Sequence, residues 1–303
     1  MSGKAGRLFK LIKTLFSETS GERRVLGALM TICAMTLIPT ADGIGKNLMD
    51  SLPPLQVICG RFVAHFLWVA PFVIFHYRAK LFNQFNPRGQ FIRAAFLFLS
   101  AFLYMLSLAE IPLARAIALF AIAPFVVAAL SFAVLGERVR AAAVFCIVGG
   151  FFGVLCIARP DTGFHIYNMV ALVSGIIYAF FILASRKVAG SAPPMVGSFY
   201  VGAVGGLSLS CILLFSETKP LATHTLYDFV LMGGLTALAH YLLARAFDFA
   251  RAAFLSLFLY WEIVAGIVIG FVLHNDFPDF RDWIGIVVIM FFGIVLIVRD
   301  KAK

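Results

Sequence analysis

The chain contains an internal repeat, and this feature constrains its fold more than any other. Residues 149–159 read GGFFGVLCIAR, and residues 289–299 read IMFFGIVLIVR, at an offset of about 140 residues. The same offset relates residues 51–56 (SLPPLQ) to residues 191–196 (SAPPMV), and Lys46 to Arg186. Because both copies are apolar throughout, the repeat predicts two homologous halves embedded in a membrane.

The composition agrees with a multi-pass membrane protein. Hydrophobic residues make up 62% of the chain and charged residues 13%, whereas soluble domains carry about 25% charged residues. The mean hydropathy is +0.97. A chain of this hydropathy has more apolar surface than a soluble fold can bury. The net charge of +10 could suggest nucleic-acid binding, but the basic residues lie in short segments between apolar runs. We therefore expect no nucleic-acid partner, and membrane lipid around the chain.

Ten apolar runs are long enough to cross a bilayer, which requires about 20 residues per helix. Short connections with proline or asparagine separate them. The expected spans are 25–47, 54–76, 91–109, 113–135, 141–158, 167–186, 194–215, 226–246, 252–273 and 281–298. The sequence therefore predicts an all-α polytopic protein of ten transmembrane helices.

The basic residues are distributed unequally between alternate connections. One side holds Lys46, Arg115, Arg159, Lys219 and Arg281, and all other Lys and Arg except Arg61 fall on the opposite side. By the positive-inside rule, the richer side and both termini are cytoplasmic. Since five spans per copy is an odd number, the two halves must be inverted relative to each other.

This pattern divides the chain into four segments. Residues 1–24 form a basic N-terminal segment, in which the spacing of Leu8, Leu11 and Leu15 suits either a helix on the membrane surface or a disordered tail. Residues 25–160 and 161–299 form the two five-span repeats, and residues 300–303 form a cytoplasmic tail. The spacing of the five cysteines matches neither a disulfide framework nor a metal site, so we expect no metal and no cofactor.

Several motifs resemble the EamA type of the drug/metabolite transporter superfamily. They are ALFAIAPFVVAALSFAVLGERV (Ala118 to Val139) and GGFFGVLCIARP (Gly149 to Pro160), together with the ten spans. The polar series from Asp42 to Arg61, and that from Tyr260 to Asp279, are similar to bacterial S-adenosylmethionine and riboflavin carriers. The resemblance implies an inner-membrane secondary transporter acting by alternating access, as a monomer or homodimer. The second half departs from the first where Tyr260 stands for Pro124, so we expect the bend at Pro124 not to be mirrored.

Three charged residues lie deep within the spans, where a charge costs about 2.5–3.5 kcal/mol or more. Asp42, Arg61 and Glu262 fall in one outer-to-central layer of the bilayer. One interpretation places Arg61 and Glu262 in a substrate cavity, with Asp42 near its outer mouth. Two others remain open: an Arg61–Glu262 ion pair that locks the halves together, and side chains that reach the membrane surface.

Other polar side chains within the spans are further candidates. His65 follows Arg61 by one helical turn, and His240 lies in span 8, so either histidine could relay protons or serve only in packing. Aromatic residues with a polar group are better cavity candidates than phenylalanine. They are Tyr104, Tyr178, Tyr241, Tyr260, Trp68 and Trp261, with Tyr260 and Trp261 preferred for stacking on the substrate because they precede Glu262.

Motifs of enzymes are absent from the sequence. It has no GxxxxGK[ST] phosphate loop, no HExxH and no GxSxG. We therefore expect a carrier of a small organic metabolite, similar to riboflavin or S-adenosylmethionine. An amino-acid or drug exporter of the same superfamily is the alternative, and an intramembrane lipid-modifying enzyme is the alternative from another class.

Overall fold

The computed structural model describes residues 21–78, 80–135, 141–158, 165–188, 190–250 and 252–300. In these ranges, all regular structure is helical, and nine helical segments are long and apolar enough to span a membrane, two of them interrupted by a break described below. Val144–Ala158 is a shorter apolar helix and completes the ten spans expected from the sequence. The expected surface helix at Leu8–Leu15 and the tail beyond Asp300 lie outside the described residues.

The two halves contain corresponding helices in the same order along the chain. The first half comprises α2 (Gly21–Met49), α3 (Pro54–Tyr77), the short α4 (Lys80–Asn83), α5 (Pro87–Leu108), α6 (Leu113–Phe120), α7 (Ala123–Leu135) and α8 (Ala141–Ala158). The second comprises α9 (Ile166–Lys187), α10 (Pro194–Leu213), α11 (Thr223–Ala246), α12 (Ala252–Leu259), α13 (Trp261–His274) and α14 (Phe280–Asp300). Proline begins α3, α5 and α10, where its fixed φ and missing N–H suit the first helical position.

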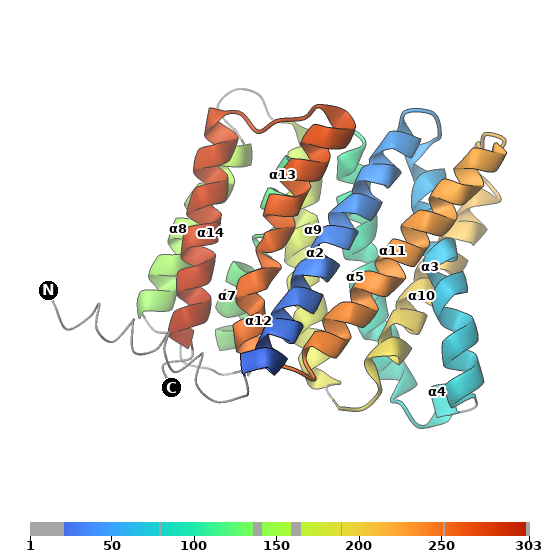
Figure 1. Cartoon of the computed structure of the whole chain (residues 1–303), viewed down its shortest axis with the longest axis horizontal. Helices are drawn as coiled ribbons and strands as arrows, with labels where there is room; N and C mark the ends of the chain where they lie inside the picture. Colours follow the sequence, from blue (N-terminus) through green and yellow to red (C-terminus); the bar gives the residue numbers. More distant parts are fainter. Residues whose placement is uncertain are drawn as a thin grey trace, which may run out of the picture.

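The two halves are inverted relative to each other. In Figure 1, α2 begins at the lower end of the bundle and α14 ends there, whereas α9 begins at the upper end. The packing obeys the same symmetry, because α2 lies against α11 as α9 lies against α5. Helices α3 and α10 pack on each other, and α8 and α14 pair at one edge of the molecule (Figure 1). The inverted repeat expected from the sequence is thus confirmed.

Both copies of the fourth span are broken near the middle. Helix α6 ends at Phe120 and α7 begins at Ala123, and in the second half α12 and α13 are separated by Tyr260. Pro124 accounts for the first break, since its ring conflicts with the carbonyl group four residues earlier. The expectation that the bend is not mirrored is therefore wrong: the second break forms without proline.

Glycines allow the closest approaches between helices. A Cβ atom at Gly285 would lie 2.7 Å from the carbonyl oxygen of Gly153, and one at Gly153 would lie 3.0 Å from that of Gly285. The backbones of α8 and α14 therefore touch directly, as small residues permit in membrane helices.

Candidate functional site

An ion pair lies at the interface of α2 and α3, inside the bundle. The guanidinium of Arg61 donates a hydrogen bond to the Asp42 carboxylate, and their side chains are 11% and 1% exposed. Glycine beside Asp42 brings α13 close, because a Cβ atom at Gly43 would lie 2.9 Å from Ile269 of that helix. Asp42 is thus buried and paired with Arg61.

Glu262 completes a charged centre with this pair. It is the second residue of α13, directly after the break in the second half, and it interacts electrostatically with Asp42 and Arg61. In the described parts of the chain, its carboxylate has no hydrogen bond and no ion pair. The Arg61–Glu262 lock considered from the sequence is therefore wrong in this conformation, since Arg61 pairs with Asp42 instead.

Aromatic rings run from the charged centre toward α9. The ring centroids of Tyr104 and Phe120 are 5.3 Å apart, those of Phe120 and Tyr178 are 4.9 Å apart, and those of Tyr178 and Phe181 are 5.2 Å apart. We call these four residues the aromatic row. Both tyrosines of the row interact electrostatically with Glu262. The row therefore borders the charged centre, and Phe120 stands at the break between α6 and α7.

The two histidines meet across the two halves of the molecule. The rings of His65 on α3 and His240 on α11 are 5.4 Å apart in an edge-to-face arrangement. Both histidines interact electrostatically with Arg61. Arg61 lies on α3, one helical turn before His65. The structure thus brings both candidate relay residues beside the charged centre.

Three predicted aromatic residues lie elsewhere. The hydroxyl of Tyr260 lies against α14, where a Cβ atom at Gly293 would be 1.8 Å away from it. Trp261 is 41% exposed, and its indole donates to Thr36 Oγ1 at 3.0 Å. Tyr241 is 42% exposed and has no hydrogen bond or ring contact in the described ranges. Tyr260 and Trp261 directly precede Glu262 in the sequence, but consecutive residues of a helix point in different directions.

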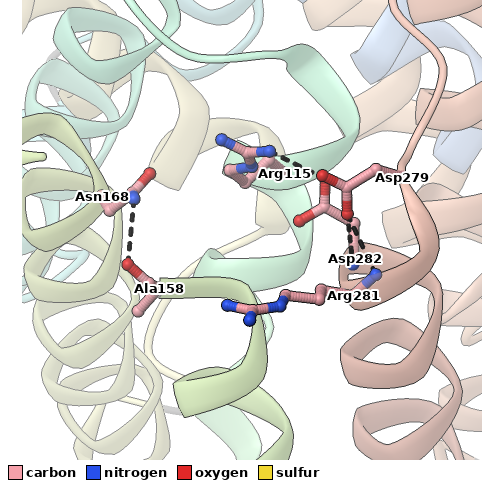
Figure 2. Close-up of polar contacts among 6 residues, drawn as sticks. All are labelled: Arg115, Ala158, Asn168, Asp279, Arg281 and Asp282. Carbon is pink, nitrogen blue, oxygen red and sulfur yellow. Dashed lines mark hydrogen bonds and ion pairs between the residues drawn. The ribbon is translucent and has the colours of Figure 1, made fainter. Parts of the chain in front are cut away.

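A polar network joins the helices at the upper end of the bundle. Figure 2 shows Arg115 of α6 directed at the start of α14, where its Nη2 donates to Asp282 Oδ2 at 2.9 Å. The Asp279 carboxylate accepts the backbone N–H groups of residues 281 and 282, each at 3.0 Å. Asn168 of α9 donates to the carbonyl oxygen of Ala158 at 3.2 Å, also drawn in Figure 2. The network therefore ties the upper ends of both halves together.

No group of metal-binding side chains is found among the described residues, and their five cysteines are free thiols. The charged centre thus combines one cation and two carboxylates with neighbouring aromatic rings.

Comparisons with known proteins agree with this architecture. Residues 25–159 and 165–299 each match the EamA-like transporter family. The pseudopaline exporter CntI of Pseudomonas aeruginosa (strain UCBPP-PA14) is 24% identical over 84% of this chain and 89% of its own length. A riboflavin transporter of Rhizobium johnstonii is 24% identical over 88% of this chain and 89% of its own length. The fold is also similar to that of a solved crystal structure, with a TM-score of 0.63 and 20% sequence identity. The superposition covers 91% of this chain and 99% of the other. The chain belongs to the EamA-like transporter family, whose members are multi-pass membrane transporters and not enzymes.

Proposed function

We propose that this protein is a secondary transporter of a small, ring-containing polar metabolite, held between its two halves in a bacterial inner membrane. The observation that carries the proposal is the position of Asp42, Arg61 and Glu262 beside the aromatic row, at the interface of two inverted repeats. Such interfaces hold the substrate site in transporters with inverted repeats. The basic connections make the lower end of Figure 1 the cytoplasmic end.

The residues of the centre suggest how such a substrate is held. A flat ring stacks on the aromatic row, which offers faces at ring spacing. Glu262 makes no hydrogen bond or ion pair in the described ranges and accepts a donor or cationic group of the substrate, while Arg61 orients an acceptor group. The aromatic row favours a substrate with a flat ring, such as a riboflavin-like vitamin. One relative is named a riboflavin transporter, which agrees with this choice.

A second candidate substrate is supported by charge. The centre contains two carboxylates and one guanidinium, so an S-adenosylmethionine-like solute with a positive group would neutralise it. The exporter among the relatives shows that export is compatible with this fold. Uptake and efflux use the same site, and the gradients across the membrane set the direction. The His65–His240 pair is placed to relay a coupling proton.

Flux through proteoliposomes tests this function. The purified protein should accumulate riboflavin or S-adenosylmethionine down an imposed gradient, and Glu262→Gln should reduce that flux at least tenfold. Because the Glu262 carboxylate makes no hydrogen bond or ion pair in the described residues, the substitution should change thermal stability only slightly. Glu217→Gln, in an exposed connection, is the matched control and should transport normally. Undiminished flux through Glu262→Gln would refute the assigned site.

A further inference from the structure

A second cation lies within a membrane-spanning helix, away from the charged centre. Arg93, in the second turn of α5, donates from Nε to Ser185 Oγ at 2.9 Å and from Nη1 to Gln90 Oε1 at 3.2 Å. Its guanidinium carbon lies 5.1 Å from the centroid of the Phe181 ring. All three partners are neutral. Within the described ranges, no carboxylate pairs with Arg93, and its Nη2 donates to no protein acceptor.

The surrounding helices leave room for this guanidinium. Helix α10 passes so close that a Cβ atom at Gly197 would lie 1.9 Å from Nη1 of Arg93. Glycine is therefore required there for the guanidinium to occupy its position. Beside it is a cavity of about 140 Å³. The cavity is lined by Gln90, Arg93, Ser185, Val188, Gly190 and Ala192.

The chemistry of this site calls for an anion. Arg93 is partly buried, and a guanidinium that is partly removed from water is stabilised by a counter-charge. Neutral oxygens and a ring face orient the group but do not neutralise its charge. The planar fork of arginine matches a carboxylate or phosphate, and the cavity volume is several times the roughly 30 Å³ that one water occupies.

We propose that Arg93 and its cavity form an anion subsite that takes a carboxylate or phosphate group of the transported molecule. Phe181 belongs to the aromatic row and also lies under Arg93, so a row of rings connects this subsite to the charged centre. A substrate can therefore place its ring on the row and its negative group at Arg93. The proposal rests on the proposed function and adds a preference, among ring compounds, for those that carry a negatively charged group.

Inorganic pyrophosphate, compared with sodium chloride at equal ionic strength, tests the subsite without any assumption about the substrate. Pyrophosphate should raise the melting temperature of the purified full-length protein in detergent. Arg93→Gln should abolish that rise. Arg88→Gln removes an exposed positive charge from the same helix, and this variant should still show the rise in melting temperature. Gly197→Ala keeps every charge but displaces the guanidinium, and it should also lose the effect. The absence of a rise in the unmodified protein, or its persistence in Arg93→Gln, overturns the proposal.

Two further arms identify the source of the anion. Riboflavin 5′-phosphate should bind at least tenfold more tightly than riboflavin, and Arg93→Gln should remove the difference while leaving riboflavin binding unchanged. If neither flavin binds, the riboflavin assignment fails, whereas the pyrophosphate result still decides the role of Arg93. If phosphatidylglycerol suppresses the pyrophosphate effect and riboflavin 5′-phosphate does not, the site belongs to a lipid headgroup and the proposal is wrong.

Discussion

Asp42 and Arg61 depend on each other because both are held away from water. A charge left without its partner inside a protein keeps the cost of desolvation and loses the attraction that offset it. The sequence identified all the charges of the centre, since charged residues are rare in apolar spans. It could not show which of them pair, because that depends on how α2, α3 and α13 cross.

Loss of one partner of this pair should therefore be costly. Arg61→Gln should lower the free energy of unfolding by about 3–5 kcal/mol, and the double variant Asp42→Asn with Arg61→Gln should recover part of that loss. Thermal unfolding in detergent provides the measurement. Arg245→Gln is the control, because its ion pair with Asp248 is exposed and worth about 0–1 kcal/mol. Equal melting temperatures for Arg61→Gln and Arg245→Gln would contradict a buried pair.

At the scale of the elements, the two broken spans distinguish this fold from a bundle of continuous helices. The apolar runs 113–135 and 252–273 are uninterrupted in hydropathy, so the sequence predicted one span in each, with a bend at Pro124 in the first alone. The structure divides each of these spans into two helices, and no proline marks the second break in the sequence. At this break the Tyr260 hydroxyl lies against Gly293 of α14, a contact between distant residues that leaves no local signal in the sequence.

Gly175 shows how α9 accommodates the first break. A Cβ atom at this position would lie 2.5 Å from the carbonyl oxygen of Phe120, a backbone atom that cannot rotate away. Gly175→Ala should therefore separate α9 from the break, lower the melting temperature by several degrees and reduce flux.

Gly206→Ala is the matched control for this substitution. The nearest heavy atoms to its Cβ position lie at 3.7 Å, an ordinary contact distance, so it should behave like the unmodified protein. If Gly175→Ala matched Gly206→Ala in both melting temperature and flux, the close contact at the break would have no importance.

The whole molecule is an inverted pair of repeats, and this level was the most predictable from sequence. The repeat, the odd number of spans per copy and the charge bias all follow from residue types and their order along the chain. The aromatic row was only partly predictable. Tyr104 and Tyr178 were candidates as tyrosines within spans, whereas Phe120, Phe181 and Arg93 join the site through contacts between α5, α6 and α9. Phenylalanine is too frequent in this chain, with 33 copies, for Phe120 and Phe181 to be singled out by composition.

Access to the centre from each side of the membrane tests the account most directly. Phe120→Cys, in a background without the five native cysteines, places one thiol on the aromatic row. A membrane-impermeant maleimide should label it from the cytoplasmic side of inside-out vesicles and from the outer side of intact cells, and substrate should slow both reactions. Labelling from one side alone, under every substrate gradient, would contradict a carrier whose inverted halves expose one central site in turn.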